Sequence, residues 1–189
     1  MIDANVRTLF DAETLAKRNE ELAREIAALK IDHLLVISIL RGSFVFVADL
    51  IRAMHHAGMK PEIEFLQLTS YREATVSSGL VEIVRDIDSD VEGRSVLLID
   101  DILESGRTLA FAKDLLAARG AKEVLTCVLL EKPHHRAVQI KADFVGFECP
   151  DLFVVGYGMD VAHSLRQLPF VGVVEHEEPS APADDPGRS

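Results

Sequence analysis

Two runs of continuous apolar residues, each followed closely by a helical pattern, constrain the fold more than any other feature of the sequence. The runs span residues 33–39 and 95–99, and the helical patterns that follow them span residues 43–58 and 108–119. Strands that are apolar along their whole length are typical of parallel sheets covered by helices on both faces. The sequence therefore predicts an α/β domain around a mostly parallel central sheet.

The remaining segments fit this interpretation. A first helix is predicted over residues 11–30, with Leu15, Leu22, Ile26 and Leu29 on one stripe. Ser43 is a suitable N-cap for the helix that runs to Gly58, and Gly120 is placed to end the helix after residue 108. Residues 70–79 are polar and aperiodic, which is typical of a lid loop. Further strands are predicted at residues 62–69, 80–85, 123–130, 142–147, 153–155 and 171–174.

Composition limits the class of function. With 189 residues the chain is expected to form one domain over residues 1–174, followed by an acidic, disordered tail over residues 175–189. The net charge of −11 argues against nucleic acid or an anionic membrane as the main partner. Two cysteines cannot form a disulfide framework, and we find neither a signal peptide nor a membrane-spanning stretch, so we expect a cytoplasmic protein.

The end of the second apolar run carries the most informative chemistry. Val96 to Ile99 leads directly into Asp100 and Asp101. Two adjacent carboxylates at the end of a buried strand are costly unless a hydroxylated or positive group meets them. A ribose diol or a hydrated Mg²⁺ ion would meet this need.

A turn that suits a phosphate follows at once. Ser105-Gly106-Arg107-Thr108 opens a helix, where free backbone N–H groups, two hydroxyls and the helix dipole favour an anion. Acids that bind a diol, placed just before a turn that binds a phosphate, match the two ends of a ribose 5-phosphate. The alternative is that this segment binds no ligand and is simply a strand that ends in solvated acids, followed by a capped helix.

Two other nucleotide sites can be excluded. An apolar strand ending in Asp is also found in P-loop proteins, but the chain contains no G-x-x-x-x-G-K-[ST] segment. Gly156-Tyr157-Gly158 lacks the third glycine of a dinucleotide-binding turn.

These residues and three further segments show that the chain resembles the type I phosphoribosyltransferases, and among them the bacterial hypoxanthine-guanine phosphoribosyltransferases. The segments are Leu40-Arg41-Gly42-Ser43-Phe44 with Ala48-Asp49-Leu50, Leu130-Glu131-Lys132-Pro133, and Phe153-Val154-Val155-Gly156-Tyr157-Gly158-Met159-Asp160. They occur in collinear order between about Leu34 and Val174. The resemblance implies a fold with a small hood formed by the terminal segments and a mobile lid. It also implies transfer of a phosphoribosyl group from 5-phosphoribosyl-1-pyrophosphate (PRPP) to a 6-oxopurine base, with Mg²⁺ as cofactor, in a homodimer or homotetramer.

The resemblance also implies roles for individual residues. Arg41 and Gly42 would form a pyrophosphate loop with a cis peptide before Arg41, Arg166 would meet the same group, and Ser70 and Tyr71 would begin the lid. Asp100 and Asp101 would hold the ribose hydroxyls and Mg²⁺, with Asp160 at a second magnesium site. The 5-phosphate cradle would be formed by Ser105, Gly106, Arg107 and Thr108.

On the base side, Lys132 would donate to the purine 6-oxygen, Phe153 would stack on the ring, and the Val154 backbone would read its edge, with Asp160 adding base contacts. The family's proposed proton acceptor is an aspartate at the position held here by Glu104. A glutamate keeps the carboxylate but adds a methylene group, and a displacement on the order of 1 Å can cost about 100-fold in rate.

Three alternatives to this function stay open. A relative of this fold could sense nucleotides and regulate transcripts, although no Lys/Arg cluster suited to RNA stands out. The base could be xanthine or a pyrimidine, against which the segment from Phe153 to Asp160 argues. Finally, Glu104 could make the chain a binding protein with impaired catalysis.

Overall fold

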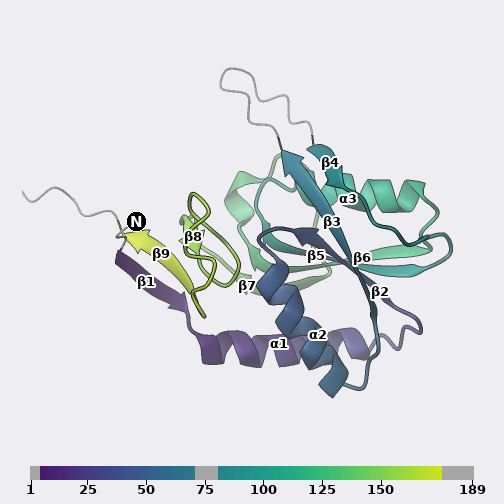
Figure 1. Ribbon diagram of the computed structural model, residues 1–189, viewed down its shortest axis with the longest axis horizontal. Helices are drawn as coiled ribbons and strands as arrows, with labels where there is room; N and C mark the ends of the chain where they lie inside the picture. The colour runs from purple at the N-terminus through teal and green to yellow at the C-terminus, as the bar shows by residue number, and fades with distance from the viewer. Residues whose placement is uncertain (1–4, 71–80, 176–189) are drawn as a thin grey trace, which may run out of the picture.

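The computed structural model describes residues 5–70 and 81–175. A six-stranded sheet forms the centre, in the strand order β4-β3-β2-β5-β6-β7 (Figure 1). Neighbouring strands run parallel, except that β3 and β4 are antiparallel. The predicted, mostly parallel sheet is therefore confirmed. Its strands are β2 (Leu35–Leu40), β3 (Glu62–Ser70), β4 (Val81–Arg85), β5 (Ser95–Leu103), β6 (Glu123–Glu131) and β7 (Phe144–Glu148).

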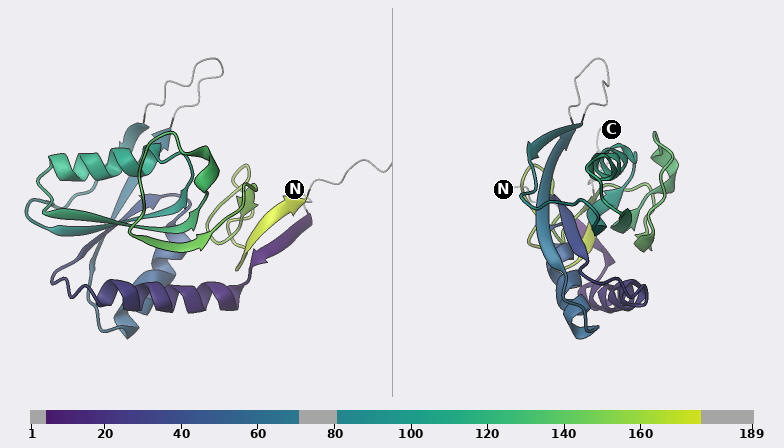
Figure 2. Two further views of the ribbon diagram at one scale, coloured as in Figure 1. Left: turned by 180° about the vertical axis from the view of Figure 1, so that it is seen from behind. Right: turned by 90° about the vertical axis from the view of Figure 1, so that its right-hand side faces the viewer.

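Helices cover both faces of this sheet (Figure 2). The helices α1 (Ala12–Ala27) and α2 (Phe44–His56) pack on one face, and α3 (Arg107–Ala118) packs on the other. A single turn of 3-10 helix, Pro133–His135, follows β6. None of the helices in the described residues is long and apolar enough to cross a membrane.

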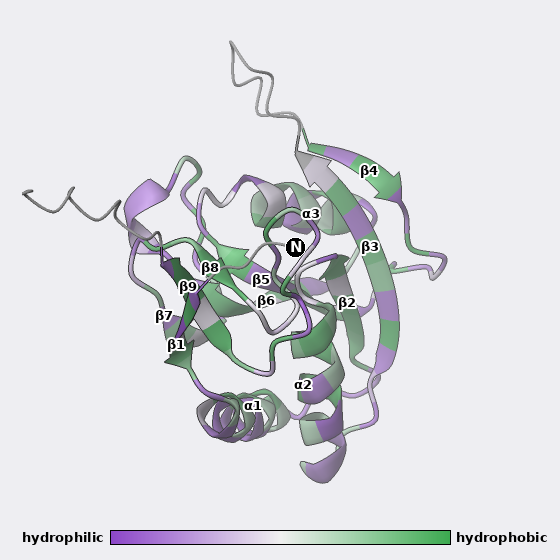
Figure 3. Ribbon diagram, turned by 60° about the vertical axis from the view of Figure 1, so that its left-hand side comes forward, coloured by the Kyte–Doolittle hydropathy of each residue, from purple (hydrophilic) through white to green (hydrophobic). Residues whose placement is uncertain are grey.

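Neighbouring residues of the buried strands pack into two different cores. In β2, Val36 belongs to the core under α1 and α2, whereas Leu35 and Ile37 belong to the core under α3. Because both faces are covered, each position of such a strand must be apolar, which explains the continuous runs in the sequence. The strand β3 lies next to the edge of the sheet and instead alternates apolar with polar residues, as the green and purple bands in Figure 3 show.

A second sheet, the hood, is formed by both ends of the described chain. It contains β1 (Asn5–Phe10), β9 (Val171–Glu175) and β8 (Val154–Val155) in the order β1-β9-β8, all antiparallel. Arg7 Nε donates to Glu175 Oε1 at 3.0 Å, joining residues 168 positions apart. In Figure 1 the hood lies to the left of the central sheet, next to the start of α1. The expected hood of terminal segments is confirmed.

Several boundaries differ from the prediction. The helix α1 ends at Ala27, and Leu29, which the sequence placed on the apolar stripe, lies beyond it with 46% of its surface exposed. The strand β5 continues past Ile99 to Leu103, so that Asp100 and Asp101 are part of the strand. The strand β1 was not predicted, because its alternating residues are stabilised by β9 from the far end of the chain.

Ser43 precedes α2 as predicted, but its side chain makes no capping hydrogen bond. Its backbone is already helical, and its hydroxyl donates to the carbonyl of Ile39 and lies 2.7 Å from the Ser38 hydroxyl. At the end of the chain, Glu175 belongs to β9 rather than to the predicted tail. The rest of that tail, from residue 176, lies outside the described residues, as does the predicted lid after Ser70.

Candidate active site

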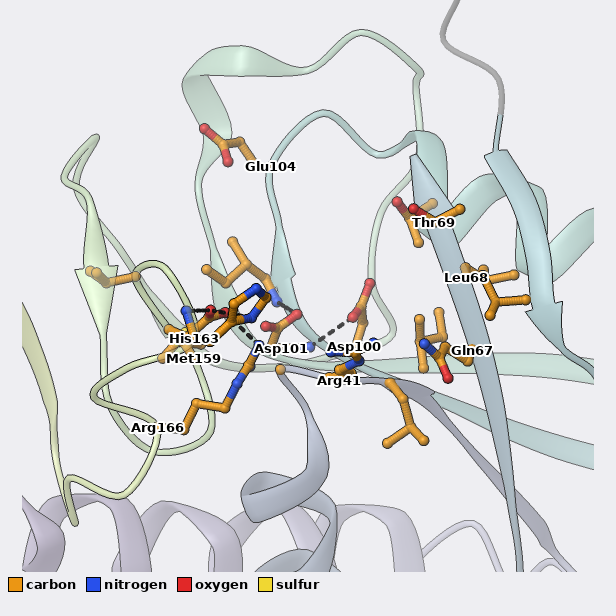
Figure 4. A pocket seen from close by; sticks show the side chains of 18 of the residues that line it. Arg41, Gln67, Leu68, Thr69, Asp100, Asp101, Glu104, Met159, His163 and Arg166 are labelled. Carbon is orange, nitrogen blue, oxygen red and sulfur yellow. Dashed lines mark hydrogen bonds and ion pairs between the residues drawn. The ribbon is translucent and has the colours of Figure 1, made fainter. Parts of the chain in front are cut away.

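A cleft of about 690 Å³ lies where the carboxyl ends of the central strands meet the hood. This is the position expected for a site in an open parallel sheet. Figure 4 shows acids from β5, a cation from the hood and residues of β3 around one cavity. The predicted residues that line the cleft are Arg41, Gly42, Asp100, Asp101, Glu104, Thr108, Lys132, Phe153, Val154, Asp160 and Arg166.

A smaller pocket of about 300 Å³ adjoins the cleft at the start of α3 and shares Asp100, Glu104 and Thr108 with it. Ser105 and Gly106 also line this pocket. Gly106 is the N-cap of α3 with φ of +81°, and a Cβ there would lie 2.7 Å from Ile140 Cγ2. Only glycine fits this turn without a shift, so free amides can point into the pocket at the positive end of α3.

Three predicted residues are not placed in either pocket. Arg107 begins α3 but lines neither the cleft nor the smaller pocket. Ser70 is the last residue of β3, and Tyr71 lies outside the described residues. For these residues the sequence-based roles stay predictions.

The acid pair is held close to the strand backbone. Asp100 Oδ1 accepts from the Asp101 N–H and Asp101 Oδ1 accepts from the Ile102 N–H, both at 3.0 Å. Burial, and then the neighbouring Asp101 charge, raise the pKa of Asp100 well above its usual range. Burial also raises the pKa of Asp101, although the hydrogen bonds with Asp100 and with the Ile102 N–H, and then the Arg166 charge, oppose this. The ionised form of the pair is therefore destabilised, and a bound cation or a hydroxyl donor would stabilise it.

The loop between β2 and α2 closes over these acids. The peptide bond between Leu40 and Arg41 is cis, as the resemblance implied. A Cβ at Gly42 would lie 1.7 Å from Asp101 Oδ2, so only a glycine can pass so close to that carboxylate. The Arg41 side chain is exposed and lines the cleft.

The segment that connects β8 to β9 in the hood contributes a further cation and a further acid to the cleft. Arg166 donates to the Gly158 carbonyl at 2.7 Å and forms an ion pair with Asp160 Oδ1 at 2.6 Å. Asp160 Oδ2 accepts from the His163 backbone N–H at 2.7 Å. In Figure 4, Arg166 extends from the hood towards Asp101 and His163. His163 lines the cleft but was not singled out from the sequence.

The residues predicted to meet the base differ sharply in exposure. Lys132 is 5% exposed, and its backbone N–H donates to the Leu103 carbonyl at 2.9 Å, which ties the end of β6 to the end of β5. Phe153 is 60% exposed although it lines the cleft, and Val154 beside it is buried in β8. A large exposed aromatic ring at the mouth of a cleft offers a stacking surface for a flat ligand.

Arg136 is a residue that the sequence did not point to. Its Nη1 donates to the Glu104 carbonyl at 2.7 Å, and its Nη2 pairs with Glu131 Oε1 at 2.6 Å. Its side chain is only 13% exposed. Arg136 therefore joins the ends of β5 and β6, next to Glu104 and Lys132. An arginine in an irregular segment gives no periodic signal, so only the fold reveals this bridge.

The carboxylates do not gather into one cage. Figure 4 shows the Glu104 side chain on the loop above Asp100 and Asp101, apart from them. Across residues 5–70 and 81–175, no group of three or more His, Cys, Asp or Glu side chains could together hold a metal ion. The acid pair thus leaves most of the coordination of any cation to water or to a substrate.

Comparison with known proteins agrees with this geometry. A family model for the phosphoribosyl transferase domain matches residues 5–162. The hypoxanthine-guanine phosphoribosyltransferase of Bacillus subtilis is 44% identical over 170 residues, which are 89% of this chain and 93% of that protein.

Two solved structures extend the comparison. The hypoxanthine-guanine phosphoribosyltransferase of Bacillus anthracis has a TM-score of 0.84 at 40% identity, covering 90% of this chain and 100% of that chain. The hypoxanthine phosphoribosyltransferase of Trypanosoma cruzi, solved with the product IMP, has a TM-score of 0.84 at 33% identity, covering 93% and 96% of the two chains.

Proposed function

The chain belongs to the phosphoribosyl transferase family, and we propose that it transfers the 5-phosphoribosyl group of PRPP to hypoxanthine or guanine, which yields IMP or GMP and pyrophosphate. One observation carries the proposal: the cleft and the pocket that adjoins it bring together the acid pair, the start of α3, two arginines and an exposed aromatic ring. These groups match the diol, the phosphates and the flat base of the two substrates. The reaction belongs to purine salvage.

The PRPP side of the cleft has three parts in our proposal. The amides and hydroxyls of residues 105–108 hold the 5-phosphate at the positive end of α3. Asp100 and Asp101 accept hydrogen bonds from the ribose hydroxyls. Arg41, Gly42 and Arg166 receive the pyrophosphate, and their positive charge stabilises it as it leaves. Ser70 and Tyr71 are assigned to PRPP binding from the family resemblance alone.

The base side of the cleft must stack on the face of the base and recognise the polar groups along its edge. Phe153 supplies the stacking surface and the Val154 backbone reads the base edge, with Asp160 adding base contacts. Lys132 donates to the 6-oxygen. Because the Lys132 side chain is buried, losing this acceptor would leave an ammonium group without a partner, which favours 6-oxopurines over bases without that oxygen.

Mg²⁺ fits the acids of the cleft. The adjacent carboxylates of buried Asp100 and half-buried Asp101 are a donor set for a hard cation, and Mg²⁺ in nucleotide sites takes one or two carboxylates together with phosphates. Asp160 is proposed for a second ion. A bound Mg²⁺ neutralises charge on the pyrophosphate.

The chemistry needs a proton acceptor and dry surroundings. The bond from C1 of the ribose to the base nitrogen forms as the bond to pyrophosphate breaks, at a carbon with oxocarbenium character. Water would capture the same carbon, so it must be excluded. Glu104 lines both pockets, and we propose that its carboxylate takes the N7 proton of the purine.

We further propose that the protein works in the cytoplasm as a homodimer or homotetramer. Its two cysteines, Cys127 and Cys149, are buried and unbonded, which suits a reducing compartment. The oligomer is inferred from the family resemblance, and light scattering coupled to gel filtration would measure it.

A panel of bases tests the proposal. Hypoxanthine, guanine, xanthine, adenine and uracil are each incubated with PRPP and Mg²⁺, and nucleotide formation is followed by absorbance. We expect product from hypoxanthine, guanine or both, and none from adenine or uracil. The absence of product with every 6-oxopurine would overturn the proposal, and product from xanthine alone would change the substrate.

A further inference from the structure

Two motif residues, Asp49 and Tyr157, carry no role in the proposed chemistry. They lie in the segments Ala48-Asp49-Leu50 and Gly156-Tyr157-Gly158, 108 positions apart in the chain. In the structure their side chains meet: the Tyr157 hydroxyl donates to Asp49 Oδ2 at 2.6 Å. Asn19 of α1 completes the group, because its Nδ2 donates to the same hydroxyl oxygen at 2.8 Å.

These three residues, which we call the hood anchor, connect three elements. Asn19 comes from α1, Asp49 from α2 and Tyr157 from the segment that follows β8. Asn19 and Tyr157 are 3% and 5% exposed, so water competes little for these hydrogen bonds. Burial, and then the Asp49 hydrogen bond, raise the pKa of Tyr157, which keeps its hydroxyl a donor at neutral pH.

The anchor is joined to the cleft through the next residue, Gly158. A Cβ at Gly158 would lie 2.3 Å from the Gly42 carbonyl oxygen, so the hood packs directly on the loop that carries Arg41. The Gly158 carbonyl accepts from Arg166, and Arg166 pairs with Asp160. Displacing Tyr157 would therefore move the hood's cation and acid relative to Arg41 and Gly42.

We infer that Tyr157 is a positioning residue: through its hydrogen bonds to Asp49 and Asn19 it fixes Arg166 and Asp160 opposite the Arg41–Gly42 loop and thereby sets the affinity for pyrophosphate. This inference rests on the proposed function. The 5-phosphate cradle at the start of α3 belongs to a different part of the fold. The anchor therefore acts mainly on pyrophosphate, and a nucleotide monophosphate, which the hood contacts only at its base, should be affected much less.

The test compares Tyr157→Phe, which removes only the hydroxyl, with wild type. Binding of pyrophosphate with Mg²⁺ and binding of IMP are measured separately by titration calorimetry, and the KM for pyrophosphate is measured in the reverse reaction. Loss of a buried hydrogen bond predicts a Kd for pyrophosphate about 5- to 20-fold weaker, with the IMP Kd within about twofold. A role in stability alone would lower Tm and leave both Kd values unchanged.

Matched variants separate the hydrogen bond from the charge. Arg52→Gln removes the other partner of Asp49, an arginine side chain that is 70% exposed, and should bind pyrophosphate like wild type. Asp49→Asn keeps an acceptor for Tyr157 and should stay close to wild type, whereas Asp49→Leu should match Tyr157→Phe. Combining Asp49→Leu with Tyr157→Phe should add little to either single change, because both remove the same bond.

The outcomes distinguish this inference from the proposed function. If wild type binds pyrophosphate and IMP but forms no IMP from PRPP, the proposed function is wrong. The Kd values of wild type and Tyr157→Phe would still test the role of Tyr157 in that case. Equal weakening of pyrophosphate and IMP in Tyr157→Phe, unchanged binding of both, or wild type that binds no pyrophosphate would overturn the inference.

Discussion

The two walls of the cleft are built in opposite ways. One wall consists of residues 100–108, and we call this whole wall the cradle because it ends in the residues proposed to hold the 5-phosphate. It is one continuous strand, turn and helix start, and its binding groups come from neighbours in the sequence. The hood segment, residues 154–170, folds back on itself instead. Its backbone takes positive φ at Tyr157, Ala162, His163 and Leu165. Tight turns alternate there with two longer-range bonds, from the Tyr157 N–H to the Leu168 carbonyl and from the Gly158 N–H to the Arg166 carbonyl. A cradle of this kind is specified locally, whereas the hood depends on distant contacts.

The difference predicts how each wall responds to substitution. Within the cradle, a changed side chain should remove one chemical role and leave the backbone in place, because the strand is anchored in the sheet on both sides. In the hood, a change at a supporting residue should displace several groups together.

The largest effect is expected for Glu104→Gln, a change confined to the cradle. Removing the carboxylate that we propose as proton acceptor should lower kcat by about 100- to 1000-fold, with the KM for PRPP within about threefold. Steady-state kinetics with hypoxanthine measures both values. Glu104→Asp, which restores the family's residue, is the matched variant and should keep far more activity. Equal turnover in Glu104→Gln and wild type would remove Glu104 from the mechanism.

Gly42→Ala tests the point where the two walls touch. A Cβ there would overlap with the Asp101 carboxylate, and the Gly42 carbonyl already lies against Gly158. Because displacements on the order of 1 Å cost about 100-fold, kcat/KM for PRPP should fall by about that factor. Gly58→Ala is the control: Gly58 has φ of +86° and no neighbour within 4 Å of the added atom, so it should lose stability alone. Normal kcat/KM in Gly42→Ala would show that the walls are not coupled here.

Asp100→Asn should make the folded protein more stable although it removes a carboxylate that we propose for binding. Because burial and Asp101 raise the pKa of Asp100, the unfolded chain ionises at lower pH than the folded one, and wild type loses stability as pH rises through the folded pKa. Without Mg²⁺ at neutral pH, the variant should therefore be more stable by about 1 to 3 kcal/mol, the usual cost of an unsatisfied buried polar group.

Urea unfolding between pH 4 and pH 8, with and without Mg²⁺, measures this difference. The gain should shrink towards pH 4, where the folded wild type binds the proton and the unfolded chain begins to bind it, and Mg²⁺ should stabilise wild type more than the variant. A variant less stable than wild type at neutral pH would show that Asp100 is not under charge strain.

Arg136→Gln should give the smallest of these effects. The change removes the bridge between the Glu104 carbonyl and Glu131, and loss of one charge-assisted bridge to a strand end should lower kcat about tenfold. Arg119→Gln is the matched control, because Arg119 forms a two-pronged ion pair with Asp86 at the other end of α3. If both variants keep wild-type kcat, the ends of β5 and β6 are fixed without Arg136.

The same contrast explains what could be predicted from the sequence. The continuous apolar runs predicted the sheet, and the local order of Asp100, Gly106 and Thr108 predicted a ribose-phosphate site, because strand, turn and helix cap leave local signals. Resemblance to the family supplied Lys132, Phe153 and Arg166, which line the cleft although no local pattern marks them.

Other features have no local signal at all. Tyr157 meets Asp49, and Arg136 meets Glu104, only because the chain returns to the same place after many residues. Ser43 shows the converse, since a local capping preference gave way to a buried hydroxyl contact with Ser38. Long-range hydrogen bonds of this kind are chosen by the tertiary structure, and propensity says little about them.

The pairing of β1 with β9 also gives the protein an order of assembly. The strand β1 leaves the ribosome long before its partner β9, because the paired residues Asn5 and Glu175 are 170 positions apart. Contacts between such distant segments form slowly, because closing a long loop costs entropy before the contact contributes. The cradle can thus fold while synthesis continues, whereas the hood, with Asp160 and Arg166, is completed last. A nascent chain would acquire its nucleotide-binding wall well before the second wall makes it a complete site.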